Sequence, residues 1–255
     1  MIKYRDALKA RKRLLKMHHE SGVGHIGGNL SVLDCLLVLT KEFMQIKNDI
    51  ILSKGHSAGA LYIALWYAGH IKSSELRTFH KDDTNLPGHP PINTMMNVPF
   101  GTGSLGHGLS LASGNALATR IKKNNGHTYC VMSDGEWQEG STWEALIFAS
   151  HHKLNNLTIF IDNNKLQGFG NTSEIASMDP LITKLDGFDL KILEIDGHNH
   201  DQIREAAKLR SKKPILVCMN TIKGKGISFM ENKMEWHYLP LDPKHYKIAI
   251  DELNV

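Results

Sequence analysis

The pattern of hydrophobic and polar positions in the second half of the chain predicts strands that alternate with helices. Apolar runs typical of buried strands occupy residues 127–133, 157–162, 190–196 and 214–220. Amphipathic segments typical of helices follow the first and third runs, at residues 138–153 and 201–212. Parallel strands need a crossover connection, usually a helix, so this alternation is typical of a parallel sheet. We therefore predict an α/β fold whose mostly parallel sheet is covered by helices on both faces.

The first half of the chain is predicted to be mainly helical. Helical patterns cover residues 4–19, 30–43, 57–70 and 104–123, and a short apolar strand lies at 50–53. Residues 82–103, rich in Pro, Asn and Gly, read as a loop, and no clear periodicity follows Met219. Because we find no repeat and no long linker, we expect residues 1–255 to form a single domain with an irregular C-terminal tail from about residue 220.

Composition narrows the class of protein without naming a function. The 255 residues are 41% apolar and 22% charged, with a formal net charge of +4. The basic residues are scattered, so we expect no nucleic-acid partner, while an anionic small ligand remains compatible with the charge. No apolar run approaches the roughly 20 residues that span a bilayer, and the N-terminus does not resemble a signal peptide. Three widely separated cysteines suit a reduced compartment, so we expect a cytoplasmic protein without a membrane partner.

An acid and an amide follow two of the predicted strands. Asp134 ends the first strand of the second half, and Asn164 follows the next, 30 positions later. In open parallel sheets ligands bind beyond the carboxyl ends of the strands. Mg²⁺ prefers oxygen ligands, so Asp134, Asn164 and the carbonyl of Leu166 could hold it, with a diphosphate nearby at the Gly135 N–H. Either dipeptide alone, Asp-Gly or Asn-Asn, could equally be a simple turn.

Two glycine-rich segments match the glycine spacing of the dinucleotide-binding motif G-x-G-x-x-G, but not the elements that must surround it. That motif requires a strand before the glycines and an acidic residue about 20 positions later. Residues 22–27 follow a predicted helix instead of a strand. After residues 101–106, Arg120 occupies the position at which the motif would require an acidic residue. We therefore expect neither segment to bind a dinucleotide.

Fifteen histidines raise the question of a zinc site. The sequence contains no H-E-x-x-H and no paired C-x-x-C, so we expect no structural zinc. His18, His19, His151 and His152 lie at predicted helix ends, and we expect them to be solvated. His25, His56 and His89 lie beside or between glycines and are better candidates for function.

Six segments in order identify a family resemblance. "SDGEWQEG…IDNNKLQG" resembles the thiamine-diphosphate motif, which begins Gly-Asp-Gly and ends about thirty residues later in Asn. The segments "SGVGHIGGNLS", "LSKGHSAGALY", "LPGHP", "GTGSLGHG" and "DGHN" are similar to characteristic loops of the transketolase family. These matches run from about residue 10 to 240. The resemblance implies the thiamine-diphosphate-binding fold, here as its diphosphate-binding domain.

The resemblance also implies roles for individual residues. It implies that Asp134, Asn164 and Leu166 hold Mg²⁺, for which Ca²⁺ or Mn²⁺ could substitute. It implies that thiamine diphosphate contacts His56, Gly103, Leu105, Gly135, Glu136, Asn164 and His237. It implies catalytic roles for His25, His89, His237 and Glu139, the last matching a family glutamate at a dimer interface. Histidines suit proton transfer with substrate hydroxyls because their pKa lies near neutrality.

A second polypeptide is expected from the same resemblance. In transketolases, the glutamate that activates the pyrimidine and the aromatic pocket for its ring lie on a second domain, and the sequence stops at Val255. We therefore expect the N-terminal subunit of a split transketolase, active only with a separate C-terminal subunit that carries the pyrimidine-binding domain. A dimer of such heterodimers is expected.

The expected reaction transfers a two-carbon ketol unit from a ketose, often a phosphate, to an aldose. The cofactor would stabilise the carbanion, and the protein would bind and orient the reactants. Alternatives are half of a deoxyxylulose-phosphate-synthase-like enzyme, the α chain of a pyruvate-dehydrogenase-like 2-oxo acid enzyme, and a non-catalytic binding protein on the same fold. The sequence does not identify the sugars.

Overall fold

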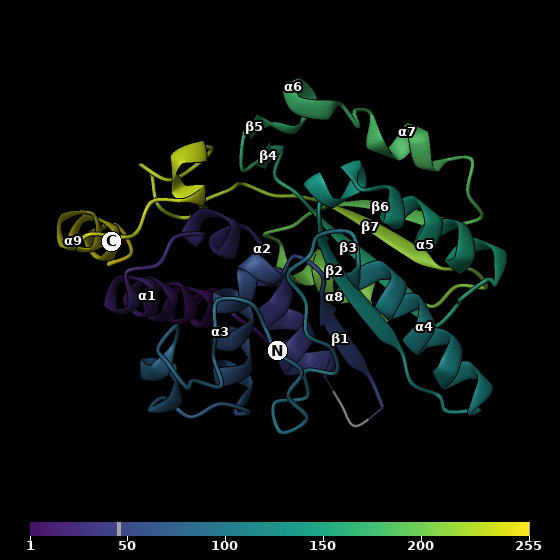
Figure 1. The fold of residues 1–255 in the computed structure, drawn as a ribbon, viewed down its shortest axis with the longest axis horizontal. Coiled ribbons are helices and arrows are strands. Elements are labelled where there is room, and N and C mark those ends of the chain that lie inside the picture. The colour runs from purple at the N-terminus through teal and green to yellow at the C-terminus, as the bar shows by residue number, and fades with distance from the viewer. Residues whose placement is uncertain (45–46, 255) are drawn as a thin grey trace.

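A five-stranded parallel sheet forms the centre of the protein, as seen in a computed structural model that describes residues 1–44 and 47–254 (Figure 1). Its strands are β1 (Asp49–Leu52), β2 (Thr128–Ser133), β3 (Leu157–Asn163), β6 (Lys191–Asp196) and β7 (Ile215–Asn220). They are ordered β1-β2-β3-β7-β6, and every neighbouring pair is parallel. The predicted mostly parallel sheet is confirmed. A two-residue antiparallel pair, β4 (Leu166–Gln167) with β5 (Gly170–Asn171), stands apart from it.

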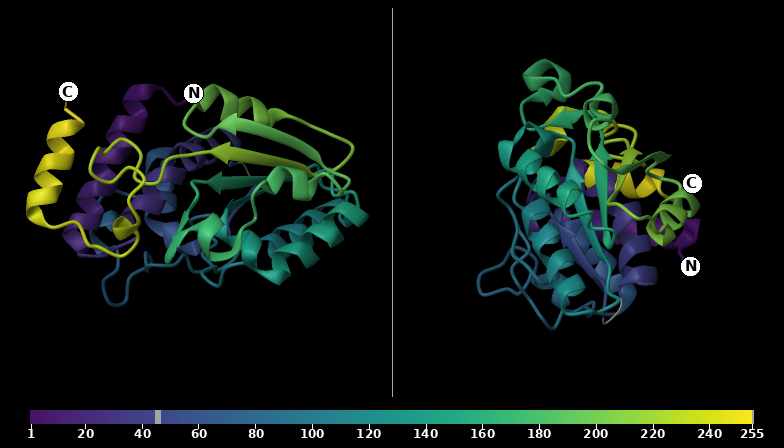
Figure 2. Two further views of the ribbon diagram at one scale, coloured as in Figure 1. Left: turned by 90° about the horizontal axis from the view of Figure 1, so that it is seen from above. Right: turned by 90° about the vertical axis from the view of Figure 1, so that its right-hand side faces the viewer.

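Helices cover both faces of the sheet, as expected (Figure 2). One layer contains α1 (Tyr4–Ser21), α2 (Ile26–Val38), α3 (Ala58–Ala68) and α8 (His200–Lys208). The other contains α4 (Gly108–Ile121), α5 (Gly140–His151) and the short α7 (Leu181–Leu185). Successive side chains of a strand point to opposite faces. Accordingly Tyr129 and Val131 of β2 join the first core, while Cys130 and Met132 join the second.

Several element boundaries differ from the prediction. The helix expected at 30–43 begins at Ile26 and continues beyond Val38 as a π-helical turn, Leu39–Phe43. The helix expected at 104–123 begins only at Gly108, since residues 101–107 form the turn that faces the site. Short 3₁₀ turns lie at Gly55–Ser57, Glu75–Thr78, Gly135–Gln138 and Met234–His237. The five-residue α6 (Thr172–Ala176) follows β5.

The C-terminal segment is more regular than predicted. It contains α9 (Pro243–Glu252), which packs beside α1, so the expectation of an irregular tail is wrong for these residues. Asp242 caps this helix by accepting a hydrogen bond from the His245 N–H at 2.8 Å, and Pro243 occupies its first turn. An Asp-Pro pair is a recognisable helix start, although hydrophobic periodicity does not mark it. Within the described ranges, no helix is long and apolar enough to cross a membrane.

Candidate active site

The two polar strand ends meet, as the sequence predicted. β2 and β3 are neighbours, with Ser133 opposite Asp162, so Asp134 and Asn164 leave the same edge of the sheet side by side. Asp134 caps the turn Gly135–Gln138, and its Oδ1 accepts the Gly135 N–H at 2.8 Å. Its Oδ2 accepts the N–H of Lys165 at 2.5 Å, which ties the two strand ends together. The crossover through α5 therefore explains the separation of the two residues along the chain.

A cavity of about 260 Å³ opens at these strand ends. It collects most of the residues that the sequence nominated: His25, His56, Gly103, Leu105, Asp134, Gly135, Asn164, Leu166 and His237. Side chains that the sequence analysis did not nominate also line it, namely Lys54, Phe169, Lys223 and Tyr238. Segments from the whole length of the chain therefore converge on one space.

Close backbone approaches hold these segments together. A Cβ atom at Gly55 would lie 2.7 Å from the backbone of Gly103, so the turn that carries His56 can rest directly on that loop only because residue 55 is glycine. The His25 N–H donates to the carbonyl of His237 at 2.9 Å. These contacts place three of the candidate histidines around the cavity, with the ring centroids of His25 and His237 5.1 Å apart.

The Asp134 carboxylate is buried without a cationic partner. Among the described residues it forms no ion pair, although it is only 6% exposed. Burial, and then the nearby negative charge of Asp162, raise the pKa of Asp134 to about 7. The Asn164 Oδ1 and the Leu166 carbonyl supply two further oxygens beside it. A carboxylate, an amide oxygen and a carbonyl form a donor set that suits Mg²⁺, which would also compensate the buried charge.

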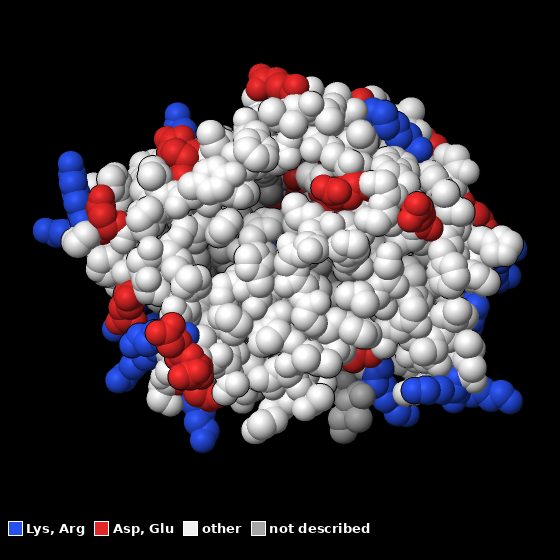
Figure 3. Space-filling view, viewed as in Figure 1, with Lys and Arg blue, Asp and Glu red and all other residues white. Residues whose placement is uncertain are grey.

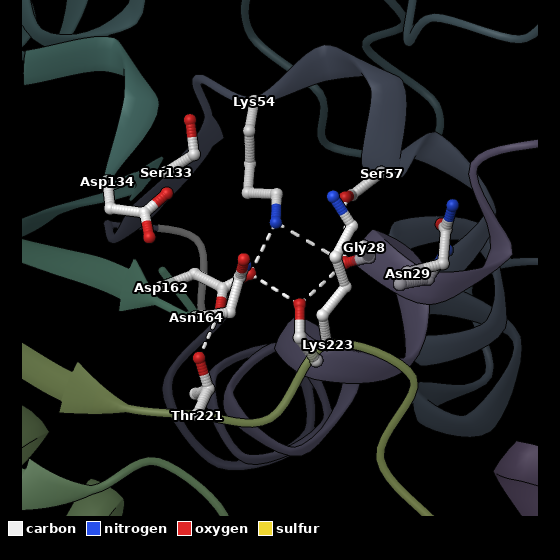
Figure 4. Close-up of polar contacts among 12 residues, drawn as sticks. Gly28, Asn29, Lys54, Ser57, Ser133, Asp134, Asp162, Asn164, Thr221 and Lys223 are labelled. Carbon is white, nitrogen blue, oxygen red and sulfur yellow. Dashed lines mark hydrogen bonds and ion pairs between the residues drawn. The ribbon is translucent and has the colours of Figure 1, made fainter. Parts of the chain in front are cut away.

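Lys54 and Asp162 form the wall behind this donor set (Figure 4). Their ion pair is fully buried, and Lys54 Nζ also donates to the carbonyl of Gly28 at 3.3 Å. Asp162 further accepts hydrogen bonds from the hydroxyls of Ser31 and Thr221. Burial raises the pKa of Asp162, but the Lys54 charge together with the hydrogen bonds from Lys54, Ser31 and Thr221 outweighs burial and holds this pKa below its usual value. This network is internally neutral, and each of its two charged groups has at least two hydrogen-bond partners.

Lys223, in contrast, is a buried ammonium without an acidic partner among the residues the structure describes. It is 2% exposed and donates to the Leu166 carbonyl at 3.1 Å and to His237 Nδ1 at 3.0 Å. Burial, followed by repulsion from Lys54, lowers the pKa of Lys223 to about 8. A bound anion in the cavity would supply the missing counter-charge.

Three of the candidate histidines, His25, His56 and His237, are held in their neutral form. Burial lowers the pKa values of His25 and His56, and burial followed by the Lys223 charge lowers that of His237 to about 3. Since the Lys223 ammonium can only donate, His237 Nδ1 must be the acceptor, and its proton must reside on Nε2. Nε2 is therefore a hydrogen-bond donor toward a substrate or cofactor oxygen.

Three nominated residues do not line this cavity. Glu136 is fully buried, and its two oxygens accept hydrogen bonds from Ser53, from the Gly106 N–H at 3.0 Å and from the Ser133 N–H at 2.9 Å. It therefore lies behind the wall, where it connects the segments that end β1 and β2 with the turn at Gly106. Glu139 is exposed beside Gly106. The His89 ring packs against Gly103 and lines a smaller adjoining cavity.

The residues that the sequence analysis missed had a weak signal. Lys223 follows β7, a buried strand whose end lies at the same edge as the ends of β2 and β3. The glycines around it suggested only a basic turn. Its position after a strand could have nominated it, but its burial depends on segments far away in the sequence.

Comparisons with known proteins agree with this geometry. The family model described as "Transketolase, thiamine diphosphate binding domain" matches residues 7–252. A 6-deoxy-6-sulfo-D-fructose transketolase subunit from a Clostridium species is 39% identical, and the match covers 96% of this chain and 93% of that protein. An apulose-4-phosphate transketolase subunit from Phocaeicola vulgatus is 35% identical, with 96% and 92% covered.

Longer transketolases share the same fold. The transketolase of Leishmania mexicana superposes with a TM-score of 0.89 at 25% identity, over 98% of this chain and 41% of that one. That of Campylobacter jejuni gives a TM-score of 0.88 at 25% identity, over 99% and 43%. The chain thus spans about two fifths of these transketolases. It belongs to the transketolase family and corresponds to the domain that binds thiamine diphosphate.

Proposed function

We propose that this chain is the diphosphate-binding subunit of a transketolase that depends on thiamine diphosphate and Mg²⁺. One observation carries the proposal: Asp134 and Lys223 face one cavity as buried groups of opposite charge that are not paired with each other. A metal cation beside Asp134 and a diphosphate beside Lys223 would compensate both charges. The whole chain would act as a single domain of the enzyme.

The proposed metal ligands are Asp134, the Asn164 Oδ1 and the carbonyl of Leu166. The diphosphate would contact Lys223, His56, His237 and the N–H of Gly135. The backbone of Gly103 and Leu105 would approach the aminopyrimidine. When bound, thiamine diphosphate supplies the electron sink for cleaving and forming the carbon–carbon bond.

The histidines would handle the protons of the substrate. His25 and His237 are neutral in the cavity wall. His237 offers its Nε2–H as a donor because its Nδ1 accepts from Lys223, which leaves His25 to offer an acceptor nitrogen. A neutral imidazole can remove a proton from a substrate hydroxyl and return it later, which suits transfer of a ketol unit between sugars. His89, beside Gly103, would extend this set.

The surroundings of the cavity suit a partner subunit. Phe169 at the cavity is 81% exposed and Tyr238 is 54% exposed, an unusual position for aromatic side chains on a free surface. On the face seen in Figure 3, charged side chains lie mainly around the periphery of a hollowed, largely uncharged centre. We propose that a separate subunit with the pyrimidine-binding domain covers this face, near Glu139, in a cytoplasmic dimer of heterodimers.

Relatives guide the choice of substrates to test. Two of them are named for 6-deoxy-6-sulfo-D-fructose and for apulose 4-phosphate. We propose a ketose or ketose phosphate as donor and an aldose as acceptor, so an assay should include both of these sugars beside common ketose phosphates.

Calorimetry on the chain combined with its partner tests cofactor binding. Asp134→Ala removes the only charged metal ligand, so Mg²⁺-dependent binding of thiamine diphosphate should be lost. Asp189→Ala removes a carboxylate from the exposed pair with Lys213 and should retain full affinity. Equal affinity of the Asp134→Ala variant and the unmodified chain would exclude the proposed metal site.

Turnover by the chain alone and with its partner tests the reaction. Ketol transfer should require both polypeptides, and transfer by the single chain at the rate of the pair would contradict the split-enzyme proposal. Release of CO₂ from a 2-oxo acid would instead indicate one of the alternative thiamine-diphosphate enzymes. Cofactor binding without any turnover by the pair would indicate a binding protein.

A further inference from the structure

A second, smaller cavity adjoins the proposed active site. It measures about 70 Å³ and shares His25 and His56 with the larger cavity, so these two residues line both spaces. We call it the inner cavity. Its wall also includes His18, His80 and His89, and no acidic side chain is among the described residues that line it. Its position behind reactive histidines makes it relevant to their hydrogen bonding.

His18 was expected to be solvated, and this expectation is wrong. The helix α1 turns this residue inward, and it is 1% exposed. Its Nδ1 lies 3.4 Å from the carbonyl of Val23, whereas its Nε2 is buried without a hydrogen-bond partner among the described residues. A polar atom left in that condition costs about 1–3 kcal/mol, so an additional partner is expected.

The tautomer of His18 follows from its neighbours. Burial lowers the pKa of His18 to about 4, so the ring is neutral near pH 7. A carbonyl oxygen can only accept, so the proton resides on Nδ1 and Nε2 carries a free lone pair. The missing partner is therefore a group that donates an O–H or N–H to Nε2.

The size and polarity of the inner cavity suit water. A water molecule occupies about 30 Å³ in the liquid and needs two to four polar partners, so about two waters would fit. His25 and His89 supply further polar partners in the same wall. His127 provides a contrast, since it is equally buried but its Nε2 lies 2.8 Å from the Thr158 hydroxyl.

We propose that the inner cavity is a site for ordered water held by His18 Nε2, and that this water sets the tautomer of His25. The second O–H of a water that donates to His18 Nε2 can be accepted by Asn29 Oδ1, which lies with Nε2 around Gly59 in the same wall. The water then presents only its oxygen to His25, so the nitrogen of His25 on that side donates to it. The other nitrogen, on the side of the larger cavity, then carries a lone pair and can accept a proton from a substrate hydroxyl. His18 is thus a positioning residue, and only its effect on catalysis rests on the proposed function.

The water site can be tested without cofactor, partner or turnover. A high-resolution crystal structure of the full chain should show an ordered water within hydrogen-bonding distance of His18 Nε2. In nitrogen NMR spectra of the imidazoles, His18 and His25 should each show a single tautomer. In His18→Leu, which removes the acceptor, His25 should become a mixture of tautomers. No water at Nε2, or an unchanged His25 spectrum in the variant, would overturn the proposal.

Turnover of the reconstituted pair tests the consequence for catalysis. We expect His18→Leu to lower kcat on the order of tenfold, with KM changed less than about twofold, because the base is misoriented rather than lost. His18→Gln retains an acceptor oxygen and should recover most of this loss. If His18→Leu fails to fold, His18→Gln takes its place in the NMR test. His25 should then keep its single tautomer, and a mixture of tautomers in His18→Gln would overturn the proposal.

His127→Leu is the matched control, because it removes an equally buried histidine outside the cavity. It should lose comparable stability while kcat stays unchanged. An equal fall in kcat for His127→Leu would attribute the effect to stability and overturn the role of His18. If the unmodified pair shows no ketol transfer, the proposed function fails, whereas the crystal and NMR results still decide the water site.

Discussion

Asp34 and Asp134 are both buried carboxylates, but their surroundings differ. Asp34 on α2 accepts two hydrogen bonds from Arg11. His198 Nδ1 also lies 2.9 Å and His200 Nε2 2.8 Å from its carboxylate oxygens. Burial raises the pKa of Asp34, but the Arg11 charge and these hydrogen bonds hold it well below its usual range. Asp134 accepts only backbone N–H groups, and its pKa is raised to about 7.

The difference distinguishes a structural site from a binding site. Around Asp34 the protein supplies the compensating charges itself, so nothing further is needed from solution. Around Asp134 the same chain supplies oxygen ligands and a buried lysine that is not paired with the carboxylate. A site whose charges are balanced only after ligands bind is prepared for function at some loss of stability.

The largest contrast is expected from the same substitution at the two aspartates. Asp34→Asn leaves Arg11 buried without its counter-charge and should lower the free energy of unfolding by about 3–5 kcal/mol. Asp134→Asn in the cofactor-free chain removes an uncompensated charge but also removes the acceptor of one backbone N–H. These two effects should largely offset each other and change the free energy of unfolding by at most about 1 kcal/mol. Urea unfolding of both variants measures this, and equal destabilisation by the two would show that Asp134 is compensated within the chain.

The two buried lysines sharpen the comparison within the site. Lys54→Met breaks the pair with Asp162 and should cost about 3–5 kcal/mol of stability. Lys223→Met should leave the stability of the cofactor-free chain nearly unchanged but weaken thiamine diphosphate binding by about ten- to a hundredfold, because the anion loses its buried counter-charge. Unfolding and calorimetry separate the two effects. A strongly destabilised Lys223→Met chain with normal cofactor affinity would reverse the assignment.

The pH dependence of stability should also differ. Since the folded pKa of Asp134, about 7, lies above the value near 4 of an unfolded chain, its contribution to stability is lost as pH rises from about 4 to about 7. Relative to the Asp134→Asn variant, the free energy of unfolding of the cofactor-free chain should therefore fall by about 3–4 kcal/mol over this range.

Asp34→Asn serves as the control for that measurement. The folded pKa of Asp34 is lowered, so its contribution is present above the unfolded value and is lost only as pH falls through the lower folded pKa. The difference between the unmodified chain and this variant should be constant between about pH 5 and about pH 8. If the difference in free energy of unfolding between the unmodified chain and Asp134→Asn were also constant over this range, it would contradict the raised pKa of Asp134.

The smallest effect is expected for a single member of the Asp34 cluster. His200→Leu removes one hydrogen bond but leaves Arg11 and His198 in place, so the loss should be about 1–2 kcal/mol. Urea unfolding of His200→Leu and Asp34→Asn side by side gives the ratio of their losses in free energy of unfolding. A loss as large as that of Asp34→Asn would mean that His200, rather than Arg11, is the principal partner.

Much of the fold could be predicted from local pattern. The apolar runs of β2, β3 and β7 identified the strands, and the helices between them required a parallel sheet. Asp134 and Asn164 could be nominated because each follows a strand directly. The start of α2 and the helix α9 were missed, since glycines and an Asp-Pro pair, not hydrophobic periodicity, mark them.

The sequence by itself therefore determined the fold class and the edge of the sheet at which ligands would bind, because these depend on patterns within a few tens of residues. It also determined the family, through six short segments that follow one another in the family's order. Only the tertiary structure decided which charges are paired. Lys54 meets Asp162 across 108 positions of the chain, Lys223 is left without an acid in the part of the chain that the structure describes, and His18 turns inward. Burial and charge pairing arise from packing between distant segments, and no local spacing specifies them.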